Sequence, residues 1–197
     1  MFGVVPRLCA LLLALSVFLL PAPAHSRTVF VGDSNTLQLA KHPSGLSDPV
    51  FIGLGGEGLA AIAPAAVGAA RLKPEKMFVM VGTNDVILER MRNFLEAYEK
   101  MISDIQRASP QTRIYVQSIL PVNCVNFPRI QQTADNANFT VANNALASLA
   151  ARLGAVYVDV AGPLTDGQGN LNKRFTDDGV HLNTSGVFVW KDILSKQ

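Results

Sequence analysis

The sequence predicts an α/β protein: a three-layer α/β/α sandwich built around a five-stranded parallel sheet. Short runs rich in β-branched and aromatic residues alternate along the chain with longer segments of helical periodicity. Turns containing Gly follow the first three of these runs, and no internal repeat or linker divides the chain. A length of 197 residues suits one domain with a substantial core.

The first residues have the pattern of a secretory signal peptide. Arg7 precedes an apolar run over residues 8–20, and Ala22-Pro23-Ala24 fits the small-residue cleavage pattern. The run is shorter than the roughly 18 apolar residues of a membrane-spanning helix. We therefore expect cleavage near Ala24, followed by export of a single domain over residues 25–197 to the periplasm or the medium, without stable membrane insertion. An uncleaved membrane anchor is the alternative.

Five short segments have the composition of buried strands. They cover residues 28–31, 50–52, 77–81, 113–118 and 156–160. Longer segments separate them, so the strands should run parallel, with helices on both faces of the sheet. The flavodoxin-like strand order 2-1-3-4-5 would make the first three strands neighbours and bring together the loops at their carboxyl ends.

The segments between the strands have helical spacing of apolar residues. It predicts helices over residues 35–40, 58–71, 91–108 and 134–153, and a last helix from about Ser185 toward Leu194. Pro64 should break the second helix. The apolar faces of the third and fourth helices are expected in the core; they comprise Phe94, Leu95, Tyr98, Met101, Ile102 and Ile105, and Val141, Ala145, Leu146, Leu149 and Leu153.

Charge and cysteine content argue against several classes of function. The formal net charge is +2 and there is no long basic run, so nucleic acid is not an expected partner. Removal of Cys9 with the signal peptide leaves Cys124 alone, without an intrachain disulfide, and we interpret it as an inert loop cysteine. The sequence has no His-Glu-x-x-His motif and no cysteine cluster, so it predicts no metal site.

Three motifs together contain the groups that serine ester hydrolysis needs: Gly32-Asp33-Ser34, Gly82-Thr83-Asn84-Asp85 and Asp178-Gly179-Val180-His181. A serine becomes a nucleophile when a base takes its proton and a third group orients that base. Ser34, His181 and Asp178 can fill these roles, and the Asn84 amide can donate to the developing oxyanion. Backbone N–H groups of a helix beginning at Ser34 would add to this stabilisation.

These groups should meet at the carboxyl edge of the sheet. Ser34 follows the first predicted strand and Asn84 follows the third. His181 follows the fifth strand and must cross three strand spacings, roughly 14 Å. The connection over residues 161–177 is long enough for this, and both it and the loop over residues 121–132 should border the site.

Asp178 is preferred to Asp177 as the orienting carboxylate. The i, i+3 spacing of Asp178 and His181 brings their side chains together if they lie on a helical turn. Asp177 is interpreted as a solvated or capping residue. Asp33 and Asp85 are interpreted as structural, the first in the tight loop after the first strand and the second as a cap.

Residues 53–58 have the pattern Gly-x-Gly-x-x-Gly, after a predicted strand and before a predicted helix. Dinucleotide binding is therefore the alternative from a different class of function. The acidic residue expected at the end of the next strand is missing, since that strand ends in Val81-Gly82-Thr83. A dissociable nicotinamide cofactor is also not expected in an exported protein.

These motifs resemble those of the SGNH, or GDSL-type, hydrolases over essentially the whole chain after the signal peptide. The resemblance covers Gly32-Asp33-Ser34, residues 53–57, and the motifs that end at Asp85 and His181. It implies an oxyanion hole made by the N–H groups of Ser34 and Gly56 and the Asn84 amide, with no metal or cofactor. Asn35 stands where many members carry Leu, Ile or another residue. Two residues depart from the pattern of the most similar members: Phe51, where Asn often precedes the glycine block, and Glu57, where Asp is common.

The resemblance further implies a serine esterase that acts on a small-molecule, glycan or lipid ester through an acyl-enzyme. The last motif is similar to that of acetylhydrolase-like bacterial members, so we expect short acyl groups, especially O-acetyl groups on carbohydrates. The alternatives are a lysophospholipase or thioesterase acting on longer chains, an O-acyltransferase, and a non-catalytic binding module. The sequence does not indicate an oligomeric state.

Overall fold

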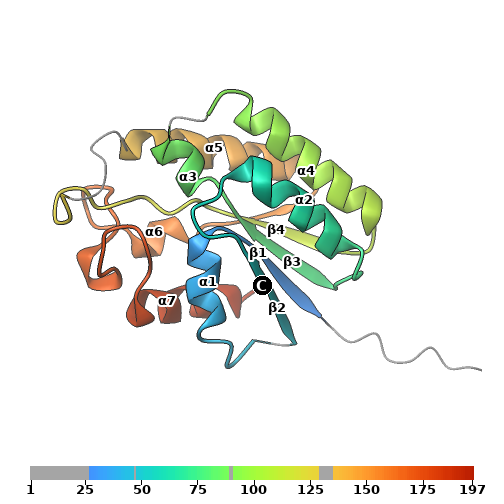
Figure 1. The fold of residues 1–197 in the computed structure, drawn as a ribbon, viewed down its shortest axis with the longest axis horizontal. Helices are drawn as coiled ribbons and strands as arrows, with labels where there is room; N and C mark the ends of the chain where they lie inside the picture. The colour runs from blue at the N-terminus through green and yellow to red at the C-terminus, as the bar shows by residue number, and fades with distance from the viewer. Residues whose placement is uncertain (1–26, 47, 89–90, 129–134) are drawn as a thin grey trace, which may run out of the picture.

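The predicted sheet is present in the computed structural model, which describes residues 27–46, 48–88, 91–128 and 135–197. Its five strands are β1 (Thr28–Gly32), β2 (Pro49–Gly53), β3 (Lys76–Met80), β4 (Arg113–Gln117) and β5 (Val156–Val158). All neighbouring strands are parallel, in the order β2-β1-β3-β4-β5 (Figure 1). This confirms the predicted fold and strand order. The predicted signal peptide lies outside the described residues.

Helices cover both faces of the sheet, so the fold has three layers (Figure 1). One face packs against α2 (Leu59–Ala70), α4 (Phe94–Ala108) and α5 (Asn136–Arg152), with the short α3 (Thr83–Ile87) beside them. The other face packs against α1 (Ser34–Ala40), α6 (Ala161–Leu164) and α7 (Thr184–Leu194). A 3₁₀ turn over Lys173–Phe175 precedes α7. Among the described residues, no helix has the length and apolar character needed to cross a membrane.

The two cores follow from the alternation of side chains along the strands. In β1, Val29 and Val31 belong to the core under α2, α4 and α5, whereas Phe30 belongs to the core over α1 and α7. Aromatic rings stack across neighbouring strands on this second face: Phe30 lies 5.2 Å from Phe51 and 5.1 Å from Phe78 between ring centroids. Both faces of the sheet are therefore buried, as a parallel sheet requires.

The prediction that Pro64 breaks its helix is wrong, because α2 is continuous from Leu59 to Ala70. Proline removes the bond that its N–H would make to the carbonyl four residues earlier, here that of Ala60. Both Pro64 and Ala60 are exposed, so water can satisfy the Ala60 carbonyl. The opposite face of α2 is buried by Ile62 and Ala66, and this packing holds the helix together.

Two apolar residues expected in the core are exposed: the relative exposure is 42% for Leu95 and 68% for Val141. The third predicted helix is also shorter than expected. Asn93, immediately before α4, has a left-handed φ of 60°, so the helix begins at Phe94 rather than at Met91. Leu95 and Val141 instead line an apolar groove between α4 and α5.

Candidate active site

Ser34, His181 and Asp178 form one hydrogen-bonded chain at the carboxyl edge of the sheet. Ser34 Oγ lies 2.8 Å from His181 Nε2, and His181 Nδ1 lies 2.6 Å from Asp178 Oδ2. The carboxylate favours the tautomer with its proton on Nδ1, which leaves the Nε2 lone pair facing the serine hydroxyl. The arrangement can therefore transfer the serine proton to the histidine.

The turn that presents Ser34 depends on its two neighbours. A Cβ on Gly32 would lie 2.1 Å from the Met80 carbonyl oxygen, so only glycine fits where β1 passes β3. Asp33 caps α1 by accepting a hydrogen bond of 3.0 Å from the Asn35 N–H. Burial raises the pKa of Asp33 above its ordinary value. The structural interpretation of Asp33 agrees with this environment.

The segment from Asp178 to His181 is a turn closed by the aspartate, not the helical turn considered from the spacing. Asp178 Oδ1 accepts from the Val180 N–H at 2.9 Å and from the His181 N–H at 2.8 Å, and Gly179 has a φ of +86°. Partial burial alone would raise the pKa of Asp178, but these bonds and the His181 ring hold it below its ordinary value. Asp177 bonds Asn183 instead, at 3.2 Å.

The long connection after β5 brings His181 across the sheet edge to Ser34. The Leu171 N–H donates to the Val122 carbonyl at 3.3 Å, and the Asn123 N–H donates to the Gly179 carbonyl at 2.8 Å. Both the described part of the 121–132 loop and the 161–177 connection therefore support the histidine turn, as expected from their positions.

Asn35 is a residue of the site whose importance the sequence interpretation missed. Its buried amide accepts from the Leu182 N–H at 3.0 Å and donates to the Val180 carbonyl at 3.3 Å. It thus holds the backbone on both sides of His181. The signal in the sequence was a polar residue directly after Ser34.

The predicted oxyanion donors lie in neighbouring loops at the same edge. Gly32 in β1 is in register with Gly53 in β2, so the loop that carries Gly56 begins beside Ser34. The Asn84 amide donates to the Glu57 carbonyl at 2.8 Å, which links the second and third loops and leaves its other N–H available. Within the described ranges, no acceptor meets the backbone N–H of Ser34 or Gly56. Gly56 has a φ of +75°, which suits glycine.

The same loops argue against dinucleotide binding. Such sites place a phosphate at the N-terminus of the helix that follows the glycines. Here an Asp85 carboxylate oxygen lies 2.9 Å from the Leu59 N–H at the start of α2, and a Cβ on Gly58 would meet that carboxylate at 2.6 Å. The anion position is thus filled by the protein's own Asp85, in agreement with its interpretation as a cap.

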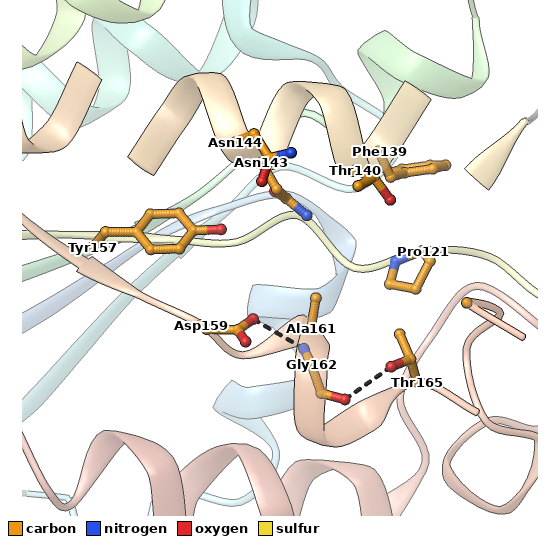
Figure 2. Close-up of a pocket in the computed structure, with 11 residues that line it drawn as sticks. Pro121, Phe139, Thr140, Asn143, Asn144, Tyr157, Asp159, Ala161, Gly162 and Thr165 are labelled. Carbon is orange, nitrogen blue, oxygen red and sulfur yellow. Dashed lines mark hydrogen bonds between the residues drawn. The ribbon is translucent and has the colours of Figure 1, made fainter. Parts of the chain in front are cut away.

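A separate pocket of about 340 Å³ lies beyond β5, between α5 and α6 (Figure 2). Several of its polar groups are already paired within the protein. Asn143 bonds both the N–H and the carbonyl of Ile119, and Asp159 accepts from the Gly162 N–H at 2.9 Å. None of Ser34, Asp178 and His181 lines this pocket.

Partial burial raises the pKa of the Cys124 thiol, which disfavours the reactive thiolate. Over the ranges that the structure describes, no group of three His, Cys, Asp or Glu side chains could hold a metal ion.

Comparison with known proteins gives a family match and several similar folds. The model of the GDSL-like lipase/acylhydrolase family matches residues 30–187. A solved structure described as an acylhydrolase of Bacteroides fragilis is similar with a TM-score of 0.77 and 20% identity, over 89% of this chain and 88% of that one. A GDSL-like lipase of Bacteroides thetaiotaomicron gives a TM-score of 0.76 and 19% identity, over 89% of each chain.

A further relative is similar in sequence over part of its length. N-acylneuraminate cytidylyltransferase of Escherichia coli O18:K1:H7 is 29% identical over 124 residues. The match covers 62% of this chain but 28% of that enzyme, so this chain spans less than a third of the relative's length.

Proposed function

Because the chain belongs to the GDSL-like lipase/acylhydrolase family of ester-hydrolysing enzymes, we propose that it cleaves carboxylic esters through an acyl-enzyme on Ser34. The observation that carries this proposal is the hydrogen-bonded chain from Asp178 through His181 to Ser34. In this mechanism His181 Nε2 takes the serine proton as Ser34 Oγ attacks the ester carbonyl carbon. Asp178 holds the Nδ1 proton and stabilises the imidazolium that forms.

The negative oxygen of the tetrahedral intermediate is stabilised by the N–H groups of Ser34 and Gly56 and by the Asn84 amide. The intermediate collapses when the imidazolium of His181 protonates the leaving alcohol. Water, deprotonated by the same histidine, then attacks the acyl-enzyme and releases the acid.

The preferred substrate is a short acyl ester of a carbohydrate, in particular an O-acetyl ester. Similarity of the last motif to acetylhydrolase-like proteins supports the short acyl group. The name of the E. coli relative refers to N-acylneuraminate, an acylated sugar acid, and this supports a sugar as the alcohol part of the ester.

The second candidate is a hydrolase of longer acyl chains, as in lysophospholipases and thioesterases. A specific feature favours it: an apolar groove of about 330 Å³, whose lining includes Val86, Phe94, Leu95 and Val141. Val86 lies in α3, two residues after Asn84, so a chain leaving the oxyanion hole past α3 could reach this groove.

We also propose that the enzyme acts outside the cytoplasm after cleavage near Ala24. Since β1 begins at Thr28, cleavage at this position would leave every described strand intact. Cell fractionation with N-terminal sequencing of the exported protein tests this, and an intact N-terminus on the exported protein would contradict it.

The function is tested by comparing hydrolysis of 4-nitrophenyl acetate and 4-nitrophenyl octanoate. We expect turnover to be faster on the acetate, and to fall by at least about 10³-fold in Ser34→Ala, which removes the nucleophile. Ser148→Ala, an exposed serine on α5, is the matched control. Full activity of Ser34→Ala would exclude the mechanism, and faster octanoate turnover would favour the second candidate.

A further inference from the structure

A polar groove of about 300 Å³ borders the proposed catalytic histidine on the side of α1. His181 and Asp178 form part of its wall. The rest of the polar lining comes from α1, its C-terminal cap and the next residue, and from the segment that leads into the first turn of α7: Gln38, Lys41, His42, Asp177, Asn183 and Thr184.

The groove lies where the alcohol part of an ester should extend. The carbonyl oxygen points to the oxyanion donors, which are the Ser34 N–H after β1 and the groups of Gly56 and Asn84 in the loops after β2 and β3. The ester oxygen must instead face His181 Nε2, because His181 protonates it on departure. The groove meets the nucleophile through His181, which lines it and whose Nε2 lies 2.8 Å from Ser34 Oγ, and Gln38 lies one turn after Ser34 on the same side of α1.

The chemistry of the groove suits an uncharged polyol. Lys41 Nζ donates to the neutral Gln38 Oε1 at 2.8 Å, which leaves its other protons able to donate to a ligand. Asp177 and Asp178 place two carboxylates in the same groove, which disfavours a phosphate-bearing alcohol. The lining contains both donors, from Lys41, Gln38 and Asn183, and acceptors, from the two carboxylates, which suits hydroxyl groups because each hydroxyl both donates and accepts.

We propose that this groove is the subsite for the leaving alcohol, that it binds a neutral sugar ring, and that Gln38 and Lys41 donate hydrogen bonds to the sugar hydroxyls. This inference rests on the proposed acyl-enzyme mechanism and assigns the place and the residues that bind the sugar part of the ester. A volume near 300 Å³, the lower limit of small-molecule sites, suits a single ring better than an extended lipid.

The test compares two esters of the same acid, 6-O-acetylglucose and 4-nitrophenyl acetate, in the full mature protein. We expect Gln38→Ala and Lys41→Ala each to lower the ratio of kcat/KM for the sugar ester to that for the phenyl ester by about 3- to 10-fold, as for one lost hydrogen bond. The loss should appear mainly in KM. Lys100→Ala, an exposed lysine on α4, is the matched control and should leave the ratio unchanged.

A second measurement does not depend on turnover. The inactive Ser34→Ala protein should bind 6-O-acetylglucose, with amide chemical-shift changes at residues 38–42 and 177–184, and Lys41→Ala in that background should weaken binding. An unchanged kcat/KM ratio in both groove variants, or shift changes confined to other elements, would overturn the subsite. Failure of the unmodified enzyme to hydrolyse 4-nitrophenyl acetate would instead overturn the proposed function and the subsite with it.

Discussion

The buried amide of Asn35 holds the backbone on both sides of His181, 3.0 Å from the Leu182 nitrogen and 3.3 Å from the Val180 oxygen. Asn35 is also covalently next to Ser34. One side chain that belongs to the serine segment therefore bonds directly to the histidine segment and helps to fix the distance between nucleophile and base.

Asn35→Leu keeps the approximate size of this side chain but removes both hydrogen bonds. We expect kcat to fall by about 10- to 100-fold, because a small displacement of a catalytic group has a large effect on rate. KM should change little. Steady-state kinetics on 4-nitrophenyl acetate measure this, with Asn144→Leu on the exposed side of α5 as the control. An unchanged kcat would mean that other contacts suffice to position His181.

Asn84→Ala should lower kcat by about 10²- to 10³-fold, the usual effect of losing one oxyanion donor. Because Asn84 also bonds the Glu57 carbonyl, the melting temperature must be recorded as well. A rate loss without a comparable loss of stability supports the oxyanion role. Equal activity of the variant and the unmodified protein would leave the two backbone N–H groups as the only donors.

Asp178→Asn should lower kcat by roughly 10⁴-fold, since an amide no longer holds the Nδ1 proton of His181. The adjacent Asp177→Asn is the matched control, because Asp177 bonds Asn183 instead.

The lowered pKa of Asp178 also predicts a pH effect on stability. The ionised carboxylate stabilises the fold above its ordinary pKa, and this contribution is lost as the pH falls through the lower folded value. The difference in melting temperature between the unmodified protein and Asp178→Asn should therefore shrink in acid.

Asp33 should show the opposite dependence on pH. Burial raises its pKa, so ionisation disfavours the folded state, and stability is lost as the pH rises from the ordinary carboxyl pKa through the folded value. Asp33→Asn keeps an acceptor for the Asn35 N–H without the charge. The melting temperature of Asp33→Asn, relative to that of the unmodified protein, should therefore increase as the pH rises from acid to neutral. A constant difference across this range, measured alongside the exposed-site variant Asp192→Asn, would contradict a raised pKa.

Gly58→Ala should destabilise the fold, because the added Cβ would lie 2.6 Å from the Asp85 carboxylate that caps α2. Displacing Asp85 would also disturb Asn84, so activity should fall together with the melting temperature. Gly68→Ala on the same helix meets no atom within 4 Å and should stabilise by about 0.5 to 1 kcal/mol. Thermal unfolding of both variants tests the pair.

The sequence predicted the sheet order and the three residues of the hydrogen-bonded chain, because strand composition and chemical motifs are local properties. It did not predict the continuous α2, since the exposure of Pro64 and Ala60 depends on how the helix packs. The sequence analysis also placed Leu95 and Val141 in the core. Helical spacing shows which residues share a face of a helix, but not how much of that face a neighbouring helix covers. No role for Asn35 followed from the sequence, because its partners lie 145 and 147 residues away and become visible only in three dimensions.

Ser34 and His181, which exchange the proton in the proposed mechanism, are 147 residues apart in the chain. A ribosome or translocase that delivers the protein from its N-terminus therefore releases the nucleophile long before the base. Until β5 has paired and the segment before α7 has docked, Ser34 has no group to take its proton. Appearance of esterase activity during synthesis or refolding should therefore report completion of the C-terminal part of the fold, and a chain cut short before His181 should be inert toward esters.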